Sequence, residues 1–161
     1  MADLWDCWHN GTKLSFEGEV YTHRLRTPMF VPEPQPYGTP KILVAAVGEL
    51  MTEVCGEVTD GVIAHAFTTK RYFDEVTIPA LQRGLAKSGR SRDDVQVFCP
   101  VFVVTGTDEA ELAATAAGTR KQIAFYASTP AYRKVLELHG WGDLQTDLHR
   151  LSLEGEWDAM A

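Results

Sequence analysis

The chain has 161 residues, of which 45% are hydrophobic and 23% are charged, and a formal net charge of −7. This composition is typical of a folded protein, and the length allows a single domain, residues 1–161, with its own core. The acidic balance without a basic stripe argues against a nucleic-acid partner, and no apolar stretch is long enough to span a bilayer. The three widely separated cysteines indicate a reducing cytoplasm rather than a disulfide framework or a metal site.

The first forty residues predict a helix followed by irregular chain. Trp5 and Trp8 are three positions apart within Met1–Asn10, which is the spacing of an amphipathic helix. Leu14–Tyr21 alternates loosely and predicts a short hairpin-like excursion. Five of the eight prolines fall within Thr27–Pro40, so this stretch is expected to be an extended surface segment. It is either a linker or a loop that crosses an active site.

The centre of the chain is Lys41–Thr69, which predicts a strand, a helix and a second strand. Ile42–Val47 is a continuous apolar run, typical of a strand that is buried on both faces of a parallel sheet. Val62–Ala64 predicts the second strand, so the whole is a right-handed βαβ unit. The apolar residues of the intervening helix are expected to form one buried stripe: Leu50, Met51, Val54, Cys55 and Val58.

The rest of the chain continues this alternation of helices and strands, which predicts an α/β fold with a parallel sheet. Pro79 predicts a kink, and Thr107 is a good candidate N-cap. The predicted elements are a helix over Lys70–Lys87, a strand over Val95–Thr105, a helix over Asp108–Tyr126, a helix beginning near Pro130 and a helix over Leu144–Leu151.

Ligands of such folds bind on the loops that follow the carboxyl ends of the strands. In the loop Ala46–Glu49, Gly48 would let the backbone turn sharply, and the N–H groups of the next helix would form an anion site. The alternative is that this glycine serves the turn alone. The charge of Glu49 opposes a phosphate unless its side chain points away.

The loop that begins at His65 is the second candidate. Thr68 and Thr69, followed by Lys70 and Arg71, could hold a phosphate at a helix start. The alternative is that one threonine caps the helix while both cations are solvated.

Other polar and aromatic side chains have simpler interpretations. His65 is expected to be a core or ring-stacking histidine; direct catalysis is the less favoured alternative, because no acid–base partner can be named for it. His139 is expected to lie at a helix end and to interact with the helix dipole. Tyr126 and Tyr132 flank a predicted helix junction and are expected to pack there, and Cys55 is expected to be inert.

Five stretches together resemble the luciferase-like monooxygenase superfamily, specifically its F420-dependent oxidoreductases. The most specific are the pairing of VAAVG with GEVTDG and the stretch AFYASTPAYRKVLELHGW; departures from the usual pattern are Cys55, Thr59 and Glu49. The stretches are LWDCWHNGTKLSFEGEVY, PQPYGTPKILVAAVG, GEVTDGVIAHAFTT, PALQRGLAKSGR and AFYASTPAYRKVLELHGW.

This resemblance implies a (β/α)8 TIM barrel that binds coenzyme F420, or alternatively FMN, and acts on a small organic substrate. It also implies that Phe16–Pro36 is an insertion covering the substrate side, and it assigns no catalytic residue. The residues it places around the phosphate and ribityl arm of the cofactor are Ala46, Val47, Gly48, His65, Phe67, Thr68 and Thr69.

A whole barrel needs about 250 residues and eight strands. The chain resembles only the central to C-terminal portion, so a partial barrel with unpaired sheet edges is expected, with residues 1–40 as a helix end and insertion and 41–161 as β/α units. Two hypotheses follow. The chain is an oxidoreductase using F420 or FMN, inactive in this short form, or it is a non-catalytic half-barrel that forms a homodimer or binds a partner.

Overall fold

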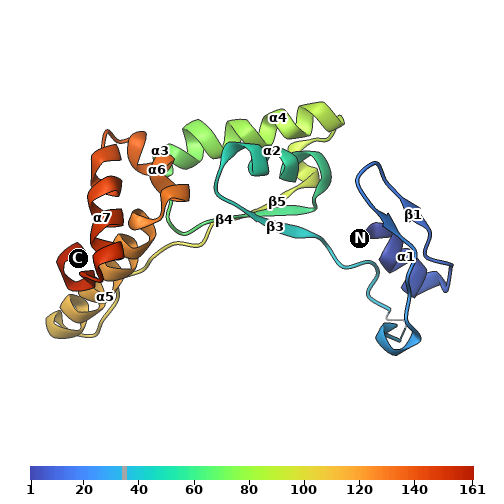
Figure 1. Cartoon of the computed structure of the whole chain (residues 1–161), viewed down its shortest axis with the longest axis horizontal. Coiled ribbons are helices and arrows are strands. Elements are labelled where there is room, and N and C mark those ends of the chain that lie inside the picture. The colour runs from blue at the N-terminus through green and yellow to red at the C-terminus, as the bar shows by residue number, and fades with distance from the viewer. Residues whose placement is uncertain (34–35) are drawn as a thin grey trace. The chain divides into compact units, whose positions relative to one another are not determined.

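The computed structural model describes residues 1–33 and 36–161 and contains two compact units, Met1–Lys41 and Ile42–Ala161 (Figure 1). Pro34, part of the predicted proline-rich segment, lies outside the described residues, as does Gln35. Within the described ranges, the structure has no helix both long enough and apolar enough to cross a membrane.

The first unit confirms the predicted helix and hairpin. Helix α1 (Ala2–Asn10) ends at Gly11, which takes the left-handed conformation with φ of 67°. Strand β1 (Phe16–Glu17) pairs antiparallel with β2 (Thr22–His23). The proline-rich segment contains one 3-10 turn, Pro28–Phe30.

The second unit is built on the predicted βαβ motif. Strands β3 (Leu43–Ala46), β4 (Gly61–Ala64) and β5 (Gln96–Phe98) form a parallel sheet in that order. Helix α2 (Glu49–Val58) connects β3 to β4. The register pairs Ala46 with Ala64, so the carboxyl ends of β3 and β4 are level.

Helices complete the second unit. The kink predicted near Pro79 is a π-helical turn just before this proline. The helices are α3 (Lys70–Tyr72), the π-helix Phe73–Thr77, α4 (Ile78–Ser88), α5 (Glu109–Ser128), α6 (Arg133–Glu137) and α7 (Gly142–Glu154), with 3-10 turns at Arg92–Asp94, Pro130–Tyr132 and Trp157–Met160.

Two details of the prediction are wrong. The strand predicted over Val95–Thr105 is paired only in β5, because its register with β4 ends at Phe98 and nothing in the described chain pairs with the residues beyond. The N-cap of α5 is Asp108, whose carboxylate accepts from the backbone N–H of Glu111 at 2.9 Å, and not Thr107.

The sheet is covered on one face only. Figure 1 shows α2 and α4 on the same side of the three strands. On that side Val62 and Val95 pack with Leu81 and Leu85 of α4. Phe98, which points to the other face, is exposed. The prediction of a strand buried on both faces is therefore wrong, because a barrel covers its inner face with side chains from further strands.

The predicted buried stripe of α2 is also wrong. Leu50 and Val58 are 82% and 69% exposed, and Met51 and Val54 are exposed as well. Of the predicted stripe only Cys55 is buried. The buried residues of α2 are Thr52, Cys55 and Gly56.

The contact between α2 and α4 explains this rotation. A Cβ atom on Gly84 would lie 1.9 Å from the backbone oxygen of Glu53, and one on Gly56 would lie 2.5 Å from the oxygen of Leu81. The two backbones therefore touch, which only glycine permits. Ion pairs of Arg83 with Glu49 and Glu53, both 3.0 Å, follow the outer edge of this contact. Because Arg83 is about half exposed, solvent screens both pairs and they add little stability.

We expect Gly84→Ala to lower the free energy of unfolding by about 3 kcal/mol, because the helix backbones must separate to admit the methyl group. Gly118→Ala in α5 is the matched control, since a Cβ there meets no atom within 4 Å. It should raise stability by about 1 kcal/mol through helix propensity. Urea unfolding of both variants measures the difference, and equal stability of Gly84→Ala and the wild type would contradict the contact.

Candidate functional site

The loops after β3 and β4 lie side by side at the carboxyl edge of the sheet. Five of the seven residues predicted to line a cofactor arm border one small cavity there, of about 10 Å³. They are Ala46, Val47, His65, Phe67 and Thr68. Thr69 borders a larger neighbouring cavity, and Gly48 borders neither. The structure therefore brings most of the predicted set together around a space no larger than one water molecule.

Gly48 begins α2, and its backbone is extended, with φ of −86° and ψ of 159°. Any residue adopts this conformation, so the sharp turn that both interpretations of Gly48 assumed does not require a glycine here. A Cβ atom at Gly48 would meet nothing within 4 Å. The helix starts with the bond from the Thr52 N–H to the Gly48 carbonyl, 3.1 Å, and has no side-chain N-cap. In the described chain, its first N–H groups therefore have no side-chain cap.

The charge of Glu49 is directed elsewhere. Its carboxylate accepts from Arg83 of α4 at 3.0 Å. The one acidic residue in this loop is therefore paired with a guanidinium on the neighbouring helix, as required if an anion is to approach the start of α2.

The second loop is built differently from the phosphate site that its cations suggested. Thr69 caps α3, since its hydroxyl oxygen accepts from the N–H of Tyr72 at 3.1 Å. Lys70 pairs with Asp74, and Arg71 pairs with Glu75, both along the exposed helix face. The geometry favours the capping alternative for Thr69 and solvated cations.

Thr68 carries the polar group without a partner in this region. Within the described part of the chain, its hydroxyl oxygen is the buried side-chain atom that makes no hydrogen bond. Leaving a buried hydroxyl unpaired costs about 1–3 kcal/mol, so such a group usually meets a ligand or water. Thr68 borders both cavities.

His65 is held by aromatic rings, as the sequence predicted. Its imidazole stacks on Tyr132, with ring centroids 4.7 Å apart, and meets the edge of Tyr126 at 4.6 Å. Its Nδ1 accepts from the backbone N–H of Phe67 at 3.0 Å. Burial lowers the pKa of His65 below its ordinary value. The ring is therefore neutral at pH 7 and carries its hydrogen on Nε2.

His139 has a role that the sequence did not reveal. It follows the end of α6, and its Nε2 lies 2.8 Å from the hydroxyl oxygen of Thr69. Its ring also stacks on Trp141, with centroids 4.9 Å apart. The hydrogen bond joins residues 70 positions apart, so no local pattern could indicate it.

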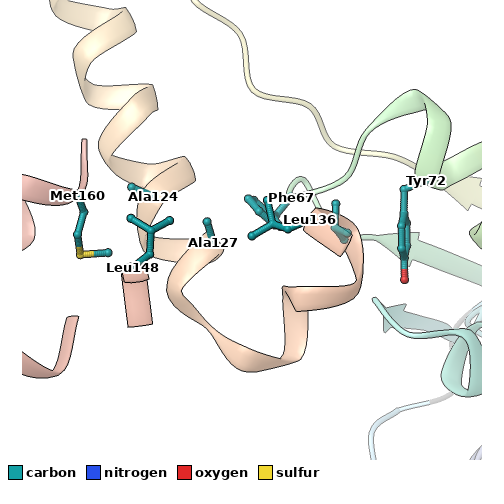
Figure 2. Close-up of a cluster of buried hydrophobic side chains, with 8 residues drawn as sticks. Phe67, Tyr72, Ala124, Ala127, Leu136, Leu148 and Met160 are labelled. Carbon is teal, nitrogen blue, oxygen red and sulfur yellow. The ribbon is translucent and has the colours of Figure 1, made fainter. Parts of the chain in front are cut away.

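The larger cavity, about 190 Å³, lies beside this hydrogen bond. The loop after β4 forms one wall, and side chains from α5 and α6 form the other. Figure 2 shows Phe67 of that loop beside Leu136 of α6, in a hydrophobic cluster that also contains Tyr72. The loop is therefore anchored in a packed core.

The cysteines and other possible metal ligands do not form a site within the described residues, where no group of three or more His, Cys, Asp or Glu side chains could hold an ion. All three cysteines are free. Cys55 is buried, and burial raises the pKa of its thiol, which agrees with the expected inert role. Cys99, by contrast, is exposed just after β5.

We expect the His65 imidazole to titrate below the ordinary histidine pKa of about 6.5, because its charged form is poorly solvated. Because the pKa is lower in the folded state, neutral His65 favours the folded state at pH values above about 6.5. This contribution to stability is lost as the pH falls through the folded-state pKa, since the unfolded chain takes up the proton more readily. Tyr132→Ala should expose the ring and raise its pKa. The pH titration of the His65 C–H resonances by NMR measures this pKa in the wild type and in Tyr132→Ala. The control is Trp141→Ala, which removes the ring stacked on His139 and should leave the pKa of His65 unchanged. A wild-type value at or above 6.5 contradicts the burial argument.

Comparison with known proteins agrees with this architecture. The family model described as luciferase-like monooxygenase matches residues 1–161. An uncharacterised protein of Mycobacterium tuberculosis H37Rv is 64% identical over 160 residues, which is 99% of this chain and 47% of that protein. The 5,10-methylenetetrahydromethanopterin reductase of Archaeoglobus fulgidus is 29% identical over 94% of this chain and 44% of its own length.

An F420-dependent glucose-6-phosphate dehydrogenase from Microbacterium testaceum is 31% identical over 64% of this chain and 28% of its own length. The chain thus spans about half or less of the curated relatives it matches.

The solved structure of the coenzyme F420-dependent tetrahydromethanopterin reductase from Methanopyrus kandleri shares the fold. It superposes with a TM-score of 0.74 at 21% identity, over 99% of this chain and 44% of that one. This match confirms the predicted α/β class, a partial barrel with parallel strands. With the family model matched over its whole length, the chain belongs to the luciferase-like monooxygenase family.

Proposed function

We propose that this chain forms the part of an F420-dependent oxidoreductase that holds the phosphate-bearing arm of the cofactor. The observation that carries the proposal is the open space before α2, where Gly48 has neither a packing nor a backbone reason to be glycine. The relatives that are named as F420-dependent support F420 over FMN. Bound F420 would supply hydride transfer to or from an organic substrate.

The residues present fit an anionic arm. The first N–H groups of α2 would bind the phosphate, favoured by the positive end of the helix dipole. The buried hydroxyl of Thr68 would gain the hydrogen-bond partner that it lacks. His65, neutral and with Nε2–H as a donor, would contribute a hydrogen bond without adding charge.

The proposal also concerns the domain organisation and the activity of the chain. Both units are proposed to belong to one incomplete barrel domain, and 16–36 is proposed to cover the substrate side. Since the chain spans about half the length of its relatives, we propose that it binds the cofactor without turning over substrate. The three free cysteines support a cytoplasmic location.

The test is a fluorescence titration of the purified chain with F420 and, separately, with FMN. Wild-type protein should bind F420 saturably, and Gly48→Val or Thr68→Val should each raise the dissociation constant about tenfold, which is about 1.4 kcal/mol. Gly118→Val is the matched control, because its Cβ also meets no atom within 4 Å yet lies far along the chain in α5.

Wild-type-like F420 binding by the Gly48→Val, Thr68→Val double variant would overturn the assignment of this site. Saturable binding of FMN with no binding of F420 would change the cofactor and favour an FMN-dependent monooxygenase.

The exposed stripe of α2 favours a second candidate, a half-barrel that associates with another chain. Leu50, Met51, Val54 and Val58 form an apolar surface on one helix face. We propose that a second copy of the chain covers this surface in a homodimer.

Sedimentation should then show a dimer for the wild type and a monomer for the Leu50→Gln, Val58→Gln double variant. Leu153→Gln in α7 is the control, because Leu153 is 77% exposed, close to the 82% of Leu50. A monomeric wild type that binds no hydrophobic dye would contradict this candidate.

A further inference from the structure

The larger cavity differs from the start of α2 in the kind of ligand that its lining favours. It holds about 190 Å³. The loop after β4 contributes Ala66, Phe67, Thr68 and Thr69; the remaining lining residues are Phe102, Ile123, Val135, Leu136, His139 and Trp141. This described lining contains no Asp, Glu, Lys or Arg side chain. It therefore favours an uncharged ligand with an apolar body.

The volume limits the size of that ligand. An engineered protein cavity of about 150 Å³ lined by apolar side chains binds benzene. A space of 190 Å³ is therefore suited to a molecule of the size of a substituted benzene. Sites for drug-sized ligands are typically larger, about 300–1,000 Å³.

The polar groups of the cavity are the unpaired hydroxyl of Thr68 and the hydrogen-bonded pair of Thr69 and His139. The Thr69 hydroxyl oxygen and His139 Nε2 are 2.8 Å apart, and one of them donates to the other. If Thr69 donates, the neutral imidazole keeps a hydrogen on Nδ1. If His139 donates, the hydroxyl hydrogen of Thr69 stays free. In either arrangement the pair retains one donor, which suits a ligand that carries an acceptor oxygen.

Trp141 lines the cavity and supplies an aromatic surface. It is 54% exposed and stacks on His139 with the ring planes 24° apart. An exposed indole that stacks on a second ring can pack against an apolar molecule. The fluorescence of this indole would change when a molecule binds beside it.

We propose that this cavity binds a small uncharged organic molecule with an aromatic or branched apolar body and one acceptor oxygen, such as an aromatic ketone. The binding site is inferred from the cavity alone and does not depend on the proposed function.

The test uses acetophenone as the probe and the full chain without cofactor. Saturation-transfer NMR should show saturable binding, and Trp141 fluorescence should change in a variant whose other tryptophans are phenylalanine. Benzoate, which has a similar size and a charge, should bind at least tenfold more weakly.

Ile123→Trp in α5 should fill the cavity and raise the acetophenone dissociation constant at least tenfold. Leu112→Trp is the matched control, since both residues are 40% exposed on the same helix and Leu112 does not line the cavity. Thermal unfolding checks that each variant is folded. If Ile123→Trp does not fold, His139→Phe, which keeps a ring against Trp141, should weaken acetophenone binding about fivefold.

Absence of saturable binding at millimolar acetophenone overturns the proposal, as does equal binding of benzoate or an equal loss in Leu112→Trp. Because the cofactor is left out, the result is independent of the proposed function. Binding of acetophenone by a chain that fails to bind F420 would support the cavity and reject the arm site.

Discussion

The backbone contact between α2 and α4 is the constraint on which the second unit depends. At Gly56 and Gly84 the two helices approach so closely that a single Cβ atom would meet a backbone oxygen. This contact holds Leu81 and Leu85 of α4 against Val62 of the sheet. It also fixes the rotation of α2, which must present its small and polar side to α4 and the sheet. The exposure of its larger apolar side chains follows from that packing.

The same rotation positions the candidate cofactor loop. Thr52 is buried by the packing of α2, and its hydroxyl donates to the Gly48 carbonyl at 3.0 Å. The Gly48 carbonyl thus accepts from both the hydroxyl and the N–H of Thr52, whereas no side chain of the described chain caps the start of the helix. The helix contact also brings Arg83 of α4 within 3.0 Å of the Glu49 carboxylate, so a cation accompanies the negative charge that would oppose an anion. The anion-binding property proposed for this loop thus depends on the contact between α2 and α4.

The sequence predicts what local periodicity determines. The change from a continuous apolar run to helical spacing was enough to predict the βαβ unit and the edge at which Ala46 and Ala64 end. The buried face of α2 could not be predicted, because two glycines on different helices decide it. Val95–Thr105 was predicted as one strand because β-branched residues favour strands even where no neighbour pairs with them. The bond between Thr69 and His139 joins distant segments, so it emerges only in the fold.

The two cavities share a wall, since Phe67, Thr68 and Val135 border both. On one side are neutral His65 and the loop that leads to the uncapped start of α2, where the helix dipole favours an anion. On the other side the described lining is mostly apolar, and its polar groups are Thr68 and the Thr69–His139 pair. A charged arm and an uncharged molecule would therefore be separated by electrostatics as well as by side chains. His65 borders the smaller cavity alone, and burial lowers its pKa, which keeps the imidazole neutral there.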